Sequence, residues 1–342
     1  MKRGLVVLDH DEVSVDEWSG RIAALQADLH AQGVDLALIY NDVSRGDDIG
    51  YLTNLVIYWN EGVLAVPAEG EATLLTKLSK RVFPWMQRTS NLTDIRSGRA
   101  FGALVSAYVA DKPAGTIGFV DAELWPAGVV REIEAAVPEW RTKLLGPLVR
   151  DRRALPSEAE LTLLRTGAGI LRDALAAATA DGLGARDRIA AIEDIARRGG
   201  FADLLFRMAD DDGHVTFEAT GQYRNGWLLI ARTFGDEQWL PALADAQRAA
   251  LGAIRPGVEW SAVEASAASA LDPLPPGSVS TLRWISQADF ATGGELQPAP
   301  ETGPAEGEVI AVVLEVVDPR GIRSVLTDTV LVARDGVEPL TI

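Results

Sequence analysis

TFEATGQYRNGWLLIARTF, residues 216–234, decides how the C-terminal half of this chain folds. Its first residues alternate between polar and apolar side chains, and residues 227–230 form an apolar run, so two neighbouring buried strands are predicted. Residues 224–226, RNG, supply a tight turn between them. The sequence therefore predicts a β-hairpin here, and the function of this half has to be sought in what its strands carry.

The segments around the hairpin predict helices on one side of a sheet. Helices are expected at 158–180 and 185–198 before the hairpin and at roughly 237–254 and 260–271 after it, and Ser157 with Glu160 forms a capping-box pattern. Apolar, β-branched strands are expected at 279–286, 309–317 and 324–332. This order indicates an α+β domain whose helices cover one face of a largely antiparallel sheet.

In the N-terminal half, predicted helices and strands alternate along the chain. A helix is predicted at 15–32, capped by Ser14 and ended by Gly33, followed by a buried strand at 36–40. Further strands at 62–66, 73–75, 92–95 and 116–120, with helices near 77–86 and from 101, predict an α/β layer domain. Residues 146–158, GPLVRDRRALPSE, are polar and basic, which is typical of an exposed connection. We therefore predict two domains, 1–150 and 151–342.

Composition excludes several classes of function. Acidic residues outnumber basic ones by 49 to 32, a net charge of −17, which repels phosphate backbones and excludes a nucleic-acid partner bound through a basic groove. The absence of cysteine excludes disulfides, thiolate metal sites and a cysteine nucleophile. No signal-type segment and no run of about 18 apolar residues is present. We expect a cytoplasmic protein without a membrane partner.

Motifs that carry chemistry are scarce. There is no GxGxxG after a strand, no P-loop and no GxSxG elbow. His214 follows the acidic run 210–212 directly before the hairpin, where it is either a catalytic candidate or a turn residue. The acidic run itself favours a solvated turn over a metal site, because neighbouring turn residues point apart.

A series of short motifs gives the chain a resemblance along nearly its whole length. In the first half these are RIAAL (21–25), GVDLALI (33–39), IGYLTNL (49–55) and LAVP (64–67). In the second half they are RR (152–153), PSEAE (156–160), residues 223–233, AIRPG (253–257), DTVLV (328–332) and DG (335–336). In this order they resemble the creatinase, prolidase and aminopeptidase P family. The resemblance implies an α/β creatinase-type N-terminal domain and an α+β C-terminal domain of the pita-bread fold.

The resemblance also implies where metal ligands would lie. Peptidases of that family hold two metal ions with two aspartates, a histidine and two glutamates. The corresponding positions here are Glu218 and Leu229 for the aspartates, Val313 or Glu315 for the first glutamate, and Thr327 for the second. No histidine follows His214. Because leucine and threonine cannot replace charged ligands, we expect neither a metal centre nor another cofactor.

Two hypotheses of function follow. The first is a non-catalytic pita-bread protein, a pseudo-peptidase, whose cleft binds a small molecule, a short peptide or a partner. The second is a metal-independent hydrolase of a small C–N substrate, as the resemblance to creatinase implies. A third interpretation, a subunit paired with an active paralogue, stays open beside the homodimer that is common in the family.

Candidate site residues serve these hypotheses in different roles. Proton carriers would be Glu218, Glu315 and His214, with Asp328 as a further carboxylate. Anion clamps would be Arg232, Arg283 and Arg323; an ion pair between Glu218 and an arginine such as Arg232 is the structural alternative. The aromatic residues have either a ligand-binding or a packing role. In the C-terminal half, Tyr223, Trp227 and Trp284 line the cleft or belong to the core. In the N-terminal half, Tyr58 and Trp59 cover the pocket of a partner subunit or form a buried turn.

Overall fold

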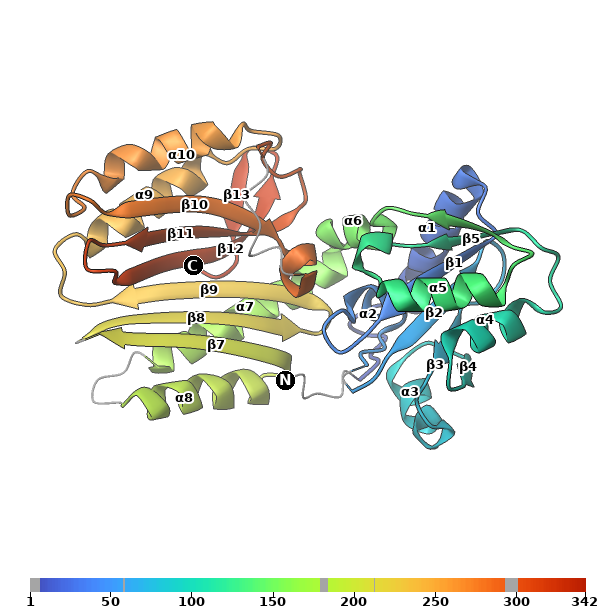
Figure 1. Ribbon diagram of the computed structural model, residues 1–342. Helices are drawn as coiled ribbons and strands as arrows, with labels where there is room; N and C mark the ends of the chain where they lie inside the picture. The colour runs from blue at the N-terminus through green and yellow to red at the C-terminus, as the bar shows by residue number, and fades with distance from the viewer. Residues whose placement is uncertain (1–6, 58, 179–183, 212, 293–300) are drawn as a thin grey trace. The chain divides into compact units, whose positions relative to one another are not determined.

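The computed structural model describes residues 7–57, 59–178, 184–211, 213–292 and 301–342, and they form two compact units. One ends at Arg153 and the other begins at Ala154. Each unit has its own sheet (Figure 1). No helix among the described residues is both long enough and apolar enough to cross a bilayer.

The first unit is an α/β layer domain, as predicted. Its sheet has the order β4-β3-β2-β1-β5-β6, with a mixture of parallel and antiparallel pairs. The strands are β1 (Leu36–Asn41), β2 (Gly62–Pro67), β3 (Thr73–Thr76), β4 (Asp94–Ser97), β5 (Thr116–Phe119) and β6 (Arg141–Leu144). The helices of this unit are α1 (Val15–Gln32), α2 (Asp47–Thr53), α3 (Phe83–Thr89), α4 (Phe101–Val109), α5 (Ala127–Ala136) and α6 (Leu148–Ala154).

The predicted caps of the first helix are confirmed. The Ser14 side chain accepts a hydrogen bond from the backbone N–H of Glu17, and Gly33 adopts a left-handed conformation with φ of 65°. The expectation of an exposed connection at 146–158 is wrong for its middle, where α6 forms. Arg153 is buried there because its guanidinium pairs with Asp47 at 3.2 Å and with Asp48 at 2.8 Å.

The second unit has the predicted α+β architecture. Its largely antiparallel sheet runs β10-β11-β12-β9-β8-β7, with β13 (Gly336–Pro339) paired to β12. The long strands are β7 (Phe201–Asp211), β8 (His214–Tyr223), β9 (Gly226–Phe234), β10 (Val279–Ser286), β11 (Val309–Val317) and β12 (Arg323–Ala333). The helices are α7 (Glu158–Ala178), α8 (Ala185–Arg198), α9 (Leu240–Ala253) and α10 (Trp260–Ala268).

The hairpin forms where the sequence predicts it, with Tyr223 paired to Gly226 across Arg224 and Asn225. The capping box is also confirmed, since Glu160 accepts from the Ser157 N–H at 3.0 Å and donates its own N–H to the Ser157 hydroxyl at 3.2 Å. β7 was not among the predicted strands. It adds an edge strand beside β8, and its last two residues are Asp210 and Asp211 of the acidic run for which a turn was predicted.

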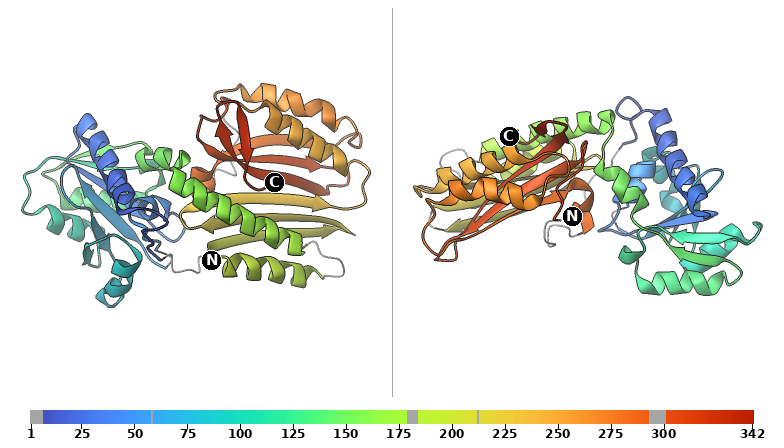
Figure 2. Two further views of the ribbon diagram at one scale, coloured as in Figure 1. Left: turned by 180° about the vertical axis from the view of Figure 1, so that it is seen from behind. Right: turned by 90° about the horizontal axis from the view of Figure 1, so that it is seen from above.

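The four helices α7 to α10 lie along one face of this sheet (Figure 2). Alternate strand residues such as Leu228 and Ile230 pack beneath α7 and α8, and Ile310 and Val312 pack beneath α9 and α10. The residues between them, such as Leu229, belong to a separate cluster with Ile285, Phe290 and Val313. Since successive strand residues point to opposite faces, this second cluster lies on the face away from the helices. We call it the open face.

Candidate ligand-binding site

A cavity of about 60 Å³ lies on the open face. At roughly 10–15 Å³ for each water-sized sphere, it has room for about four to six such spheres. Its walls come from all the long strands of the sheet: Leu205 and Arg207 on β7, Glu218 and Thr220 on β8, Leu229 on β9, Arg283 and Ile285 on β10, Val313 on β11, and Arg323 and Thr327 on β12.

Strand register brings these side chains together. Arg207 pairs with Glu218, Glu218 with Ala231, and Ala231 with Thr327. Thr327 pairs in turn with Val313, and Val313 with Arg283. Directly paired residues of antiparallel strands point to the same face. One row across the sheet thus delivers side chains from strands that are far apart in the sequence to a single cavity.

Arg323 lies between two carboxylates. It donates to both oxygens of Glu218, from Nη1 to Oε1 and from Nη2 to Oε2, the latter at 3.1 Å. Its Nη2 also lies 2.7 Å from Oε2 of Glu315. Burial opposes the charged guanidinium, but the hydrogen bonds and charges of Glu218 and Glu315 outweigh it and hold the pKa of Arg323 above its usual value. Both carboxylates therefore share one cation of the chain itself, which offsets one of their two negative charges.

The cavity lining is rich in arginine and partly apolar. Three arginines and one glutamate line it, although the chain as a whole carries a charge of −17. The remaining wall combines the hydroxyls of Thr220 and Thr327 with four aliphatic side chains, Leu205, Leu229, Ile285 and Val313. Guanidinium groups pair with carboxylate in a two-point geometry, and aliphatic walls favour an apolar body. This lining suits a small anion with an aliphatic portion.

The side chains present do not fit a two-metal centre. Of the two residues that the sequence left open for the first glutamate, Val313 pairs with Thr327 and lines the cavity, whereas Glu315 pairs with Val325. Among the implied positions that line the cavity, Glu218, Leu229, Val313 and Thr327, only Glu218 is a carboxylate. Both of its oxygens accept from Arg323. Across the described ranges, no three histidine, aspartate or glutamate side chains converge as a metal site would require.

Glu218, Arg283 and Arg323 are therefore brought together as candidate residues, and Glu315 reaches the group through Arg323. Glu218 forms an ion pair with an arginine, as the alternative interpretation of this residue predicted, but the arginine is Arg323 instead of Arg232.

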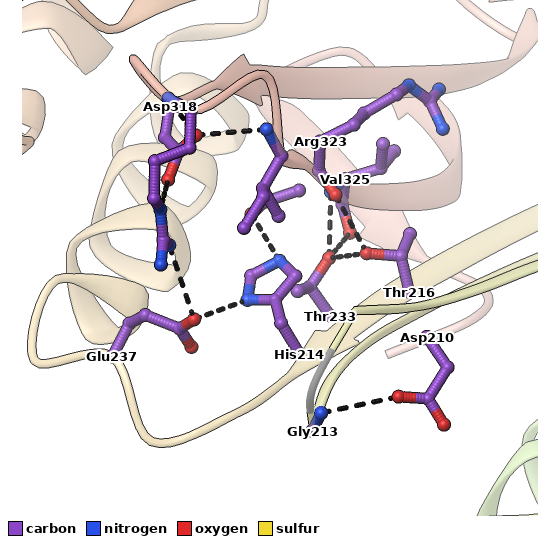
Figure 3. A network of polar contacts seen from close by, with 12 residues as sticks. Asp210, Gly213, His214, Thr216, Thr233, Glu237, Asp318, Arg323 and Val325 are labelled. Atoms are coloured by element: carbon purple, nitrogen blue, oxygen red, sulfur yellow. Dashed lines mark hydrogen bonds and ion pairs between the residues drawn. The ribbon is translucent and has the colours of Figure 1, made fainter.

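Arg232 and His214 lie outside the cavity wall. The Arg232 guanidinium donates to Asp328 at 2.6 Å and to the backbone oxygens of Ala231 and Thr327. His214 is buried; Nδ1 lies 2.9 Å from Glu237 Oε1, and Nε2 lies 2.9 Å from Ser324 Oγ (Figure 3). Each side chain is thus occupied by polar partners of the chain.

The aromatic candidates divide between core and surface. Tyr223 is buried against Phe201 with ring centroids 5.3 Å apart, and Trp227 belongs to the apolar cluster of the open face beside the cavity. Trp284 packs under α10 against Trp260. In the first unit, Trp59 is exposed and packs against Trp85, with ring centroids 5.0 Å apart and the rings tilted by 40°. Tyr58 lies outside the described residues.

Sequence reasoning missed Arg207, Thr220 and Leu205 as cavity residues. Arg207 and Leu205 lie on β7, whose segment FADLLFRMADD was not predicted as a strand. The alternation of side chains along a strand could have revealed these two residues. If the segment is a strand paired with β8, Leu205 and Arg207 lie on the same face as Thr220 and Glu218.

Comparisons with known proteins agree with this architecture. A model of the creatinase/prolidase N-terminal domain matches residues 21–155. A search of curated protein sequences finds no match.

Solved structures match over nearly the full chain. The X-Pro aminopeptidase from Thermotoga maritima MSB8 superposes with a TM-score of 0.76 at 18% identity, covering 94% of this chain and 97% of that one. The prolidase from Pyrococcus horikoshii OT3 gives 0.72 at 18% identity, covering 94% and 98%. The Xaa-Pro dipeptidase from Bacillus anthracis gives 0.72 at 18% identity, covering 95% and 97%. At such identity these matches show the fold alone.

The chain therefore has the fold of the prolidases and Xaa-Pro peptidases, with residues 21–155 similar to the creatinase/prolidase N-terminal domain and a pita-bread C-terminal domain.

Proposed function

We propose that this protein is a non-catalytic relative of the Xaa-Pro peptidases that binds a small anionic ligand in the cavity of the open face. One observation carries the proposal: three arginines, Arg207, Arg283 and Arg323, line the cavity beside one glutamate, Glu218. Guanidinium groups gathered around a partly desolvated site favour a carboxylate through charge-assisted hydrogen bonds.

The same geometry counts against hydrolysis. A metal-independent hydrolase needs a carboxylate or an imidazole that can exchange a proton with the ligand. Both oxygens of Glu218 accept hydrogen bonds from Arg323, and the His214 ring is held between Ser324 and Glu237. Ligand binding without turnover is therefore the function that we favour.

Titration with three isosteric probes tests the proposal: isobutyrate, neutral isobutyramide and cationic isobutylamine. Isothermal titration calorimetry at low ionic strength should detect isobutyrate alone, because screening weakens charge recognition at higher salt. Arg283→Gln should weaken isobutyrate binding about tenfold or more, the range expected for a lost charged hydrogen bond. Arg334→Gln, an exposed arginine outside the cavity, is the matched control.

Location and turnover are tested separately. Leu205→Trp fills the cavity mouth from an exposed position of the edge strand β7, and it should abolish binding. Val279→Trp makes the same change at an exposed position of the opposite edge strand and should leave binding intact. Incubation with Xaa-Pro dipeptides and Mn²⁺ should give no free proline; hydrolysis abolished by Leu205→Trp would refute the non-catalytic assignment.

A further inference from the structure

Three consecutive residues at the start of β12 are held by side chains of other strands. The Thr216 hydroxyl donates to the backbone oxygen of Arg323 at 3.0 Å. The Thr233 hydroxyl accepts from the Val325 N–H at 2.8 Å and lies 3.1 Å from the Val325 carbonyl oxygen. Figure 3 shows both threonines converging on this segment. Side-chain bonds thereby fix the backbone on each side of Ser324.

Ser324 itself ends a buried hydrogen-bonded chain. Its Oγ lies 2.9 Å from His214 Nε2, and His214 Nδ1 lies 2.9 Å from Glu237 Oε1. Ser324 is 0% exposed and His214 is 3% exposed. The ring of Trp239 lies beside the imidazole, with centroids 6.2 Å apart. The chain therefore links β12 to the start of β8 and to the segment before α9.

Glu237, at the other end of this chain of contacts, connects back to the residues just before β12. Arg320 lies 3.8 Å from Glu237 Oε1 and donates from Nε to Asp318 at 2.7 Å. Asp318 also accepts from the backbone N–H groups of Arg320 and Ile322, at 2.8 and 2.9 Å. Glu237 is thus connected both to Ser324, through His214, and to the residues that lead into β12. The network closes on the segment that carries Arg323.

A serine, histidine and glutamate in this order have the spacing of a nucleophile, its base and an orienting acid. Burial of Ser324 and His214 excludes that use in this arrangement, because no ligand can reach the serine oxygen. A network of hydrogen bonds and ion pairs between buried side chains makes its surroundings rigid. The residue on which this rigidity can act is Arg323, the neighbour of Ser324 in the chain.

We propose that Glu237, His214 and Ser324 are positioning residues for Arg323. Arg323 directly precedes Ser324, and its guanidinium reaches Glu218 and Glu315 beside the cavity. Fixing Ser324 fixes the Cα position and direction of Arg323, so the guanidinium is held in place before a ligand arrives. Preorganisation of this kind lowers the entropic cost of binding. The effect on ligand affinity rests on the proposed function; the effect on Arg323 does not.

Nuclear magnetic resonance of the ligand-free protein provides the first test. The guanidinium signals of Arg323, assigned by their loss in Arg323→Lys, should shift or broaden in Ser324→Ala and in Glu237→Gln. Ser266→Ala is the matched control, because it removes a hydroxyl from α10 with two hydrogen bonds, to Ala249 and Val263, outside the network. Unchanged Arg323 signals in folded Ser324→Ala and Glu237→Gln would overturn the proposal. If Ser324→Ala does not fold, Glu237→Gln alone decides.

Affinity provides the second test. Ser324→Ala should weaken isobutyrate binding about fivefold, the effect of about 1 kcal/mol for one hydrogen bond. In an Arg323→Lys background the same substitution should have no further effect, whereas a general loss of structure would persist there. A persisting effect would refute the positioning role. Shifted Arg323 signals with no isobutyrate binding by the wild type would support positioning and refute the proposed function.

Discussion

Arg323 and Glu218 are 105 residues apart in the sequence, yet both guanidinium Nη atoms of the arginine meet both carboxylate oxygens of the glutamate. The pair stands where the family resemblance implies a metal ligand, and Arg323 supplies the positive charge there.

Arg323→Met should destabilise the protein. It leaves Glu218 and Glu315 facing each other, partly buried, with their shared cation removed. We expect a loss of about 1–3 kcal/mol in the free energy of unfolding, the usual range when a charged hydrogen-bonding partner is removed. Urea unfolding of Arg323→Met, Glu218→Gln and the double variant measures this loss. If the pair interacts, the double variant loses less than the sum of the single variants; simple additivity would contradict the assignment.

Purified protein should contain no stoichiometric transition metal. The cavity offers Leu229, Val313 and Thr327 where charged ligands would be required, and Glu218 is bound to Arg323. Elemental analysis after purification without chelators, and thermal unfolding with and without Mn²⁺, check this expectation. One equivalent of bound Mn, Co, Zn or Fe, or a midpoint that rises with Mn²⁺, would show that the ligand positions are assigned wrongly.

Asp328 should make the protein less stable as pH rises. Burial raises the pKa of this carboxyl, although the charge and hydrogen bonds of Arg232 and hydrogen bonds from Thr341 and Gln247 oppose the rise. A pKa above the unfolded value, about 3.9, means that this contribution to stability is full below that pH and is lost as pH rises through the folded pKa. Urea unfolding between about pH 4 and 7 should therefore show a smaller decline for Asp328→Asn than for the wild type.

Asp318 provides the control of opposite sign. Burial raises its pKa, but hydrogen bonds from Arg320 and from the backbone of Ile322 and Arg320 outweigh this and lower it. A lowered pKa contributes stability above the unfolded pKa that is lost as pH falls through the folded one. Asp318→Asn should thus reduce the loss of stability below about pH 4. If both variants change the pH profile in the same direction, the environments of the two carboxyls are not as described.

Two glycines of the first unit should respond oppositely to alanine. A Cβ on Gly102 in α4 would lie 2.6 Å from the Glu132 backbone oxygen, whereas one on Gly20 in α1 would meet nothing within 4 Å. Gly20→Ala should stabilise by up to about 1 kcal/mol, the difference in helix propensity. Gly102→Ala should destabilise by about 1–3 kcal/mol, because backbone must move. Thermal unfolding measures both, and equal midpoints would contradict the close packing of α4 on α5.

Much of the fold was predictable because its elements carry their pattern locally. β10 and β11 have the bounds expected for apolar, β-branched segments, and Ser14, Gly33, Ser157 and Glu160 cap helices as their positions predict. β7 and α6 lack such patterns. β7 forms because it pairs with β8, and α6 is anchored by the ion pairs of Arg153. Contacts distant in sequence order both segments, so local reasoning does not find them.

The sequence by itself determined the two-domain fold, the absence of charged side chains at most of the implied ligand positions, and several residues of the candidate site. The tertiary structure decided which of them act together. It pairs Glu218 with Arg323 in place of Arg232 and adds Arg207 to the cavity wall. It also buries His214 against the hydroxyl of Ser324, outside the cavity. The physical reason is strand register: a shift by one residue turns every side chain to the other face, and register is set by pairing between distant strands.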